Sequence, residues 1–220
     1  MKANMKNKIL RLLNIEGTFA LWFVLTGIAT QAVVFALSDD SLLSFVSGVA
    51  GVVSVVLCSQ RKLSFYFWGF LQIATFVVLC IQEQLYGKLI ENAFYFVTMV
   101  AGLVMWKKNL MGEAVETRKL AHEQWCFLQA FLWSFSCCLA FLLLRAGGSN
   151  PILDGFTTMF AIAAQILMIS RYWESWLCWL WVNILCIALW YIEGNWCMVA
   201  QYIFWTANCI YGMIKWNKKI

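Results

Sequence analysis

Long apolar runs, broken only by short polar segments, recur along almost the whole of this chain. A bilayer core about 30 Å thick is crossed by roughly 20 apolar residues in a helix, and these runs have that length. Lipid cannot hydrogen-bond to exposed backbone, so such runs must form helices. The composition agrees, since 63% of the residues are hydrophobic and 12% are charged, far from the balance of a soluble domain. The sequence therefore predicts an all-α integral membrane protein.

Eight apolar segments are long enough for one membrane helix each. The predicted helices cover residues 17–37, 42–59, 64–82, 89–106, 126–145, 152–170, 175–192 and 196–216. The longest polar break, Lys107 to Gln124, contains the single histidine, His122. The first helix follows a basic start, as a signal peptide would, but its apolar run is longer than a signal peptide needs. We predict that it is retained.

Basic residues are concentrated in alternate polar breaks. One set of breaks, together with both termini, holds every Lys and Arg of the chain except Lys88 and Arg145. Cytoplasmic loops of membrane proteins carry the excess of Lys and Arg, so both termini are predicted to be cytoplasmic. A basic cytoplasmic rim also accounts for the net charge of +5, and the sequence predicts no nucleic-acid partner.

Motifs for metal, cofactor or covalent chemistry are missing from the sequence. The nine cysteines have no C-x-x-C spacing, and His122 has no second histidine to complete a ligand set. The chain also lacks a phosphate-binding Gly-rich loop, a G-x-S-x-G motif and an H-E-x-x-H motif. We therefore predict no cofactor, no metal site and no enzymatic activity.

The second to fourth predicted helices resemble the sixth to eighth in sequence. An offset of about 111 residues pairs Phe65 with Trp176, Trp68 with Trp179 and Gln72 with Asn183, and an offset of about 110 pairs Glu91 with Gln201 and Tyr95 with Trp205. A single connecting helix returns the second triplet to the membrane in the same orientation, so the predicted 3+1+3 repeat is parallel. Transporters are often built from such repeats, with the substrate site between them. The predicted parts are 1–41 (N-terminal segment and extra helix), 42–106 (first repeat), 107–151 (loop and linker helix), 152–216 (second repeat) and 217–220 (tail).

Aromatic and polar side chains share helix faces within both repeats. Residues three, four and seven positions apart lie on one face of a helix. Four faces combine the two kinds of residue: Trp68 with Gln72; Glu91 with Tyr95 and Thr98; Trp176 with Trp179 and Asn183; and Gln201 with Trp205 and Asn208. We predict that these residues form a pocket for a flat, polar, partly aromatic ligand.

Structural roles compete with this interpretation. Membrane amides also join helices, at about 0.6 to 2 kcal/mol each, so each amide is open to either role. Tryptophans near helix ends are usually interfacial anchors, and we assign that role to Trp106, Trp173, Trp196 and Trp216. Glu91 is either a functional group within a span or an exposed residue at its rim. Asp154 is predicted to cap the sixth helix.

The stretches Tyr86–Trp106 and Asp154–Trp216 resemble the PnuC family of bacterial nicotinamide riboside transporters. The most specific part is the pattern W-x-x-W-x-x-x-N, formed here by Trp176, Trp179 and Asn183. The resemblance implies a SWEET-like fold, a homotrimer in the bacterial inner membrane, and facilitated diffusion of nicotinamide riboside, which a cytoplasmic kinase then traps by phosphorylation. It also implies that Trp179, Asn183, Trp205 and the amides of the repeat faces contact the ligand. Related proteins carry thiamine or riboflavin, so these vitamins are alternatives.

Nicotinamide riboside suits an aromatic and amide pocket. Aromatic faces attract its pyridinium cation by about 0.5 to 2 kcal/mol per contact, and amides offer both donors and acceptors to its carboxamide and ribose. Two other functions compete. A membrane enzyme acting on a lipid would use Glu91 and Asp154 as acids, but no nucleophile or metal set accompanies them. A structural membrane subunit would use the amides only to join helices.

Overall fold

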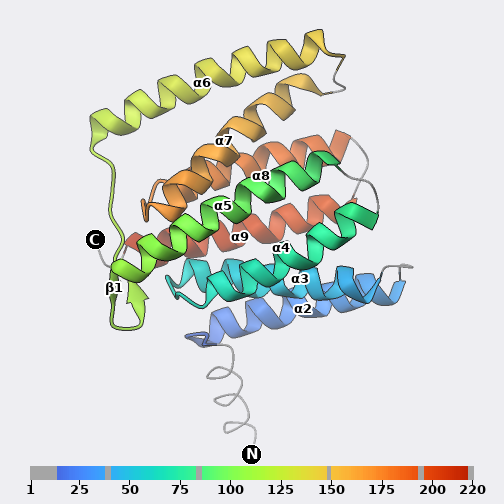
Figure 1. Cartoon of the computed structure of the whole chain (residues 1–220), viewed down its shortest axis with the longest axis vertical. Helices are drawn as coiled ribbons and strands as arrows, with labels where there is room; N and C mark the ends of the chain where they lie inside the picture. The colour runs from blue at the N-terminus through green and yellow to red at the C-terminus, as the bar shows by residue number, and fades with distance from the viewer. Residues whose placement is uncertain (1–13, 38–40, 83–85, 148–149, 193–195, 218–220) are drawn as a thin grey trace, which may run out of the picture. The chain divides into compact units, whose positions relative to one another are not determined.

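The computed structural model describes residues 14–37, 41–82, 86–147, 150–192 and 196–217, which are mainly helical (Figure 1). The helices are α2 (Thr18–Leu37), α3 (Leu42–Ser59), α4 (Phe65–Gln82), α5 (Tyr86–Lys108), α6 (His122–Arg145), α7 (Pro151–Ile169), α8 (Ser175–Ile192) and α9 (Trp196–Asn217). Five of them, α2, α3, α4, α6 and α7, are long and apolar enough to cross a membrane. The predicted all-α membrane class, with eight helices, is confirmed.

The loop between α5 and α6 differs from its prediction. It contains a short antiparallel hairpin of β1 (Leu110–Met111) and β2 (Ala114–Val115), which the sequence analysis missed. The helix α6 begins four residues earlier than predicted, because the Gln124 side chain accepts a hydrogen bond from the Ala121 N–H at 3.1 Å and closes the helix start. His122 therefore lies on the first turn of α6, and its placement in the loop was wrong.

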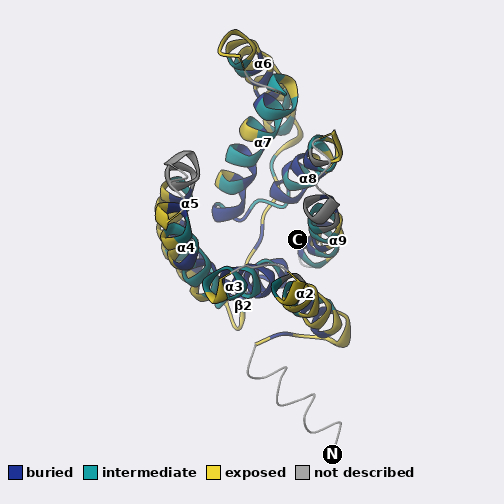
Figure 2. Cartoon of the chain, turned by 90° about the vertical axis from the view of Figure 1, so that its right-hand side faces the viewer, coloured by how far each residue is buried: buried dark blue, intermediate teal, exposed yellow. Residues whose placement is uncertain are grey.

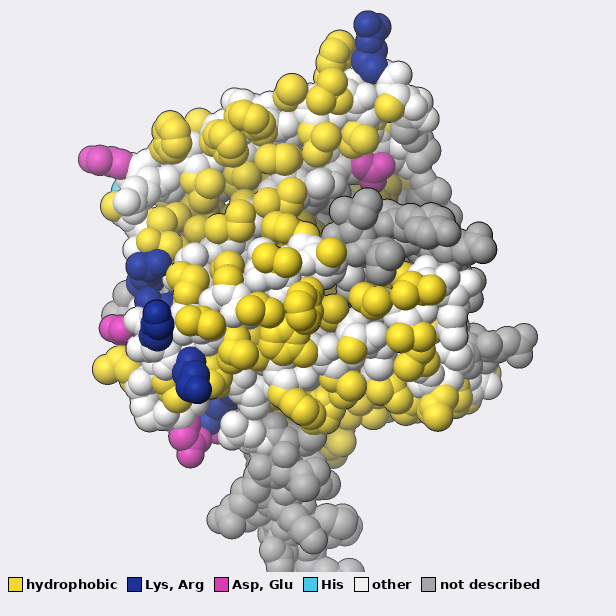
Figure 3. All heavy atoms as spheres, in the orientation of Figure 1, with side chains coloured by type: hydrophobic (Ala, Val, Ile, Leu, Met, Phe, Trp, Pro, Cys, Tyr) yellow, Lys and Arg dark blue, Asp and Glu magenta, His cyan; other side chains and the backbone are white. Residues whose placement is uncertain are grey.

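The chain forms two compact units, Met1–Glu116 and Thr117–Ile220. In the first unit, α3 packs against α2 and α4, and α4 packs against α5. In the second unit, α6, α7, α8 and α9 pack against one another in chain order. Figure 2 shows many exposed residues along α2 and α6, the first helix of each unit, and Figure 3 shows hydrophobic side chains covering α6 and α7. Such exposed apolar surface is expected where a helix faces lipid.

The same tight turn joins α3 to α4 and α7 to α8. Its central residue is an arginine in the left-handed region, Arg61 with φ of 60° and Arg171 with φ of 66°. The Arg61 N–H donates to the Cys58 carbonyl at 2.9 Å, and the Arg171 N–H donates to the Met168 carbonyl at 3.0 Å. This conformation is uncommon for a residue with a Cβ, so its recurrence 110 residues later is a specific local similarity of the two units.

The turns set which helix positions of the two units correspond. At an offset of 110, Tyr66 corresponds to Trp176, and Gln72 corresponds to Val182. The predicted offset of 111 for these helices paired Gln72 with Asn183 instead. The difference arises because that offset matched side-chain types, whereas the turn hydrogen bonds fix where each helix begins.

Asp154 was expected to cap α7, but the N-cap residue is Asn150, and Asp154 lies in the first turn of the helix. Pro151 starts the helix, where a missing N–H costs nothing. The prediction was wrong because this proline sets the helix start. An acidic residue in the first turn still stabilises the helix dipole.

Candidate substrate-binding site

Two amides of the predicted faces lie inside the second unit. Asn183 of α8 and Asn208 of α9 are 2% and 4% exposed. The Asn183 Nδ2 donates to Cys209 Sγ at 3.3 Å, so the Asn183 side chain faces α9 beside the residue that follows Asn208. An asparagine amide has two N–H donors and an acceptor oxygen, and the bond to sulfur uses one donor. The arrangement leaves hydrogen-bonding capacity for a polar ligand.

Trp176, on the same face of α8, is buried, with 3% of its surface exposed. Its ring meets Trp216 edge to face, with centroids 5.5 Å apart and an interplanar angle of 87°. It also lies directly against Gly212, where a Cβ would approach the ring to 2.6 Å. The indole N–H has no hydrogen-bond partner within the described part of the chain. A buried N–H is costly to leave unpaired, so Trp176 is a candidate donor to a ligand as well as an aromatic surface.

The other predicted residues of the second unit are less buried. Trp179 is half-buried and packs against the apolar cluster that Leu167 and Cys178 belong to. Gln201 and Trp205 of α9 are also half-buried, and the Trp205 ring lies 6.0 Å from that of Tyr202. These side chains are therefore partly available to a ligand.

In the first unit, Gln72 of α4 lies against the backbone of α3. Its Nε2 is 2.9 Å from the position that a Cβ on Gly51 would occupy. The Ser47 hydroxyl donates to the Gln72 carbonyl at 3.4 Å, which joins the same two helices. The missing side chain of Gly51 thus leaves space on α3 for the Gln72 amide of α4. Trp68, one turn earlier, is half-buried and meets Phe67 edge to face at 5.5 Å.

The predicted face of α5 has two described side chains, Tyr95 and Thr98, both half-buried. The Thr98 hydroxyl donates to the carbonyls of Phe94 and Tyr95 at 2.9 and 3.0 Å. Its single O–H is thus used within the helix, and its oxygen can act only as an acceptor. Glu91 lies on α5, but its side chain is outside the described residues.

Two tryptophans that were predicted to be interfacial anchors are instead fully buried. Trp106 of α5 and Trp216 of α9 are both 0% exposed. Trp106 meets Tyr66 edge to face at 5.6 Å and 89°, the geometry that Trp216 forms with Trp176. The anchor assignment was wrong because position near a helix end does not show which way a ring points.

Tyr66 was missed in the sequence analysis, because the offset of 111 paired Phe65 with Trp176. It is 1% exposed, and its hydroxyl, like the Trp176 indole, has no hydrogen-bond partner among the residues described. Each unit thus has one buried polar aromatic group packed edge to face on a tryptophan. The offset of 110 would have identified Tyr66 from the sequence.

The remaining two predicted anchors differ. Trp173 is half-buried and donates its indole N–H to the Met213 carbonyl at 2.9 Å, so it joins the α7–α8 turn to α9. The Trp196 side chain lies outside the described residues.

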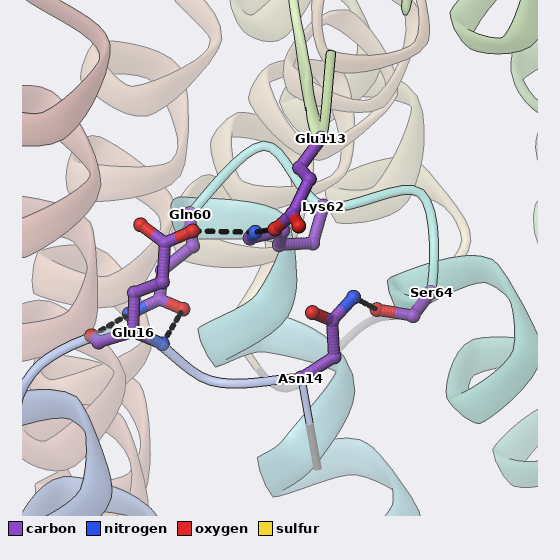
Figure 4. A network of polar contacts seen from close by, with 6 residues as sticks. All are labelled: Asn14, Glu16, Gln60, Lys62, Ser64 and Glu113. Carbon is purple, nitrogen blue, oxygen red and sulfur yellow. Dashed lines mark hydrogen bonds and ion pairs between the residues drawn. The ribbon is translucent and has the colours of Figure 1, made fainter. Parts of the chain in front are cut away.

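A charged network surrounds the α3–α4 turn (Figure 4). Lys62 is 1% exposed and pairs with Glu16 at 2.5 Å and with Glu113 of the hairpin at 2.7 Å. Burial alone would lower the pKa of Lys62, but its hydrogen bonds to Glu113 and Glu16 outweigh burial and raise it. At Arg61, burial dominates and lowers the pKa. The network fixes the segment before α2, the turn and the hairpin to one another.

Aromatic faces, buried amides and unpaired aromatic donors can bind a ligand but offer no covalent chemistry. In the parts of the chain that the structure covers, no three His, Cys, Asp or Glu residues are grouped to hold a metal ion.

The family model described as "Nicotinamide mononucleotide transporter" matches residues 41–218. The chain belongs to this family. It is similar to the nicotinamide riboside transporter PnuC of Haemophilus influenzae, with 34% identity over 205 residues that cover 91% of this chain and 89% of that protein. It is also similar to PnuC of Neisseria mucosa, with 32% identity over 214 residues, covering 91% and 81%. The resemblance noted in the sequence is confirmed.

A solved structure of the family has the same fold. The crystal structure of the vitamin B3 transporter PnuC matches with a TM-score of 0.76 and 31% identity, and the match covers 92% of each chain. The family fold therefore extends over nearly all of this chain.

Proposed function

We propose that this chain transports nicotinamide riboside across the membrane. The observation that carries the proposal is the buried group on α8 and α9, in which Asn183 and Trp176 offer amide and indole donors beside aromatic rings. A pyridinium, a carboxamide and ribose hydroxyls are complementary to these groups. The names of the similar proteins from H. influenzae and N. mucosa support the same cargo.

A nucleoside fits the described residues better than the nucleotide that the family description names. A phosphate buried in a membrane protein needs a cationic partner. The described Lys and Arg side chains lie in turns, in loops or in the terminal turns of helices, as Arg145 and Lys215 do. No described basic side chain lies deep in a helix, which supports nicotinamide riboside over its phosphate. Thiamine and riboflavin remain alternative cargoes.

The proposed mechanism is facilitated diffusion by alternating access, in which bound cargo is exposed first to one side of the membrane and then to the other. The proposed moving parts are the parallel repeats of residues 42–106 and 152–216, and the equivalent turns at Arg61 and Arg171 support this division. The described acidic side chains lie outside the helices or in their first turns, as Asp154 does. The absence of a described acid deep in a span favours transport without ion coupling.

We propose that a reaction in the cytoplasm sets the direction of net uptake. A kinase there would phosphorylate the incoming nucleoside, and the added charge of about −1.5 to −2 would prevent its return. The proposal places the protein in the bacterial inner membrane as a homotrimer, with both termini cytoplasmic, in agreement with the basic residues of alternate loops.

Uptake of radiolabelled nicotinamide riboside into proteoliposomes tests this function. With no ion gradient, the internal concentration should rise to the external one and stop, and enclosed kinase with ATP should carry accumulation beyond that level. Empty liposomes are the control. Accumulation that requires an imposed proton or sodium gradient would contradict facilitated diffusion, and uptake of thiamine or riboflavin in place of nicotinamide riboside would change the cargo.

A further inference from the structure

The hairpin between α5 and α6 exposes apolar side chains in a segment that is otherwise polar. Leu110 is 40% exposed and Met111 is 67% exposed, and together they form β1. Both lie outside the described helices, so the contact of a membrane helix with lipid does not account for their exposure. Exposed apolar groups that gather at one place mark a surface for a membrane or for another molecule.

The other residues of the hairpin are accounted for by contacts within the first unit. Val115 of β2 is 1% exposed. The Glu113 carboxylate pairs with the buried Lys62 ammonium at 2.7 Å, so the acidic group beside the tip already has its counter-charge (Figure 4). Gly112 makes the turn with φ of 66°, a conformation that residues with a Cβ rarely adopt. The apolar side chains of β1 are left without such a role.

The hairpin is fixed at the end of two membrane helices. The Val115 N–H donates to the Arg61 carbonyl at 3.0 Å, and Ala114 forms a β-bridge with Lys62. Arg61 and Lys62 lie in the turn between α3 and α4, which are both long and apolar enough to cross a membrane. Figure 1 shows the hairpin beyond the ends of α3 and α4, and Figure 2 shows its exposed tip projecting past α3. The tip therefore lies outside α3, at the level where the headgroup layer of about 5 to 8 Å begins.

Two lysines lie next to the apolar tip. Lys107 and Lys108 are the last residues of α5, and both are exposed. Within the described parts of the chain, neither forms a salt bridge. The Asn109 side chain donates to the Met105 carbonyl at 2.7 Å, which ties the link between α5 and the hairpin to the helix end. The Met111 Cα is three residues from that of Lys108, at most about 11 Å away.

Positive charge beside an apolar tip is complementary to an anionic membrane surface. A lysine near such a surface strengthens membrane contact by about 5-fold, and apolar side chains gain by leaving water for the interface. We propose that the segment Lys107–Met111, the hairpin anchor, binds the headgroups of anionic phospholipids and inserts Leu110 and Met111 among them. Lysines in a last turn also stabilise the helix dipole, but the dipole does not account for the apolar tip.

The membrane is favoured over a soluble partner as the occupant. The hairpin anchor continues directly from α5 and is held at the ends of α3 and α4. Lipid headgroups are therefore always present at a high effective concentration, whereas a soluble protein would have to be captured from dilute solution. The proposal concerns the surrounding lipid and is independent of the transported cargo.

Fluorescence of the full chain in nanodiscs tests the proposal. Met111 is replaced by Anap, a fluorescent amino acid whose emission shifts to the blue in apolar surroundings. In nanodiscs that contain phosphatidylglycerol, we expect blue-shifted emission that spin-labelled lipid headgroups quench and that aqueous iodide does not. Nanodiscs of phosphatidylcholine alone should give a smaller shift. Emission typical of water in both lipids, or a blue shift that persists in detergent without lipid, would overturn the proposal.

A matched pair of charge variants tests the role of the lysines. Lys107→Gln with Lys108→Gln should lower the ratio of inserted to free anchor by about 25-fold, at about 5-fold for each lysine. Lys119→Gln with Lys215→Gln removes the same charge from the second unit and should leave the ratio unchanged. An unchanged ratio in the first variant, or an equal fall in the second, would contradict specific binding of headgroups by the hairpin anchor.

Discussion

Replacing Asn183 by leucine separates a ligand-binding amide from one that only joins helices. The side chain is 2% exposed, and its Nδ2 bonds to Cys209 Sγ at 3.3 Å. Leucine removes the hydrogen-bonding groups with little change in size. If the amide binds cargo, the substitution leaves a polar group of the ligand unpaired, at about 1 to 3 kcal/mol. That loss of binding free energy raises the dissociation constant by roughly 5- to 150-fold.

The assay is isothermal titration of nicotinamide riboside into purified protein, beside a thermal melt of each variant. The matched control is Cys209→Ala, which removes the acceptor of the Asn183 bond but keeps the amide. It should lower stability by about 0.6 to 2 kcal/mol and leave the dissociation constant near that of the wild type. If Asn183→Leu binds as tightly as the wild type while its melting temperature falls, the amide only joins helices and the reasoning fails.

Three further changes test the packing and the charges. Gly212→Ala places a Cβ 2.6 Å from the Trp176 ring. We therefore expect thermal melts to show a loss of about 1 to 3 kcal/mol in folding stability, together with weaker binding of cargo. A melting temperature equal to that of the wild type would contradict the close contact. Replacing Glu16 and Glu113 together by glutamine leaves Lys62 buried without a counter-charge, and this should lower folding stability by about 3 to 5 kcal/mol. Either single replacement should lower it by about 1 kcal/mol. If chemical denaturation shows that the double loss equals the sum of the single losses, the shared network is refuted. Because the pKa of Lys62 is raised above 10.5, its contribution to stability is complete below that pH and is lost as the pH rises through the raised value. The wild type should therefore lose melting temperature more steeply above pH 10.5 than Lys62→Met, and parallel pH profiles would contradict the shift.

The membrane helices were predictable from the sequence because lipid makes a single requirement, a run of apolar residues long enough to cross it. The start of α6 was not predictable, since the bond between the Ala121 N–H and the Gln124 side chain extends the helix into a polar segment. The hairpin at Leu110–Val115 was missed because strands of two residues give no periodic pattern.

The candidate site was predictable only in part. Helical spacing placed Trp176 and Asn183 on one face, and both are buried. Spacing within one helix does not show what lies opposite, so the contact of Asn183 with Cys209 and the close approach of Gly212 to Trp176 appeared only in the structure. Tyr66 was missed through an alignment error of one residue, which rotates a helical position by about 100°.

Equilibrium binding of nicotinamide riboside to the purified protein tests the central claim most directly, with nicotinamide mononucleotide, thiamine and riboflavin titrated in parallel. The aromatic and amide faces predict saturable binding of nicotinamide riboside and much weaker binding of its phosphate, because no described cation lies deep in a span. Binding of thiamine, riboflavin or the mononucleotide without binding of nicotinamide riboside would contradict the assignment of the cargo.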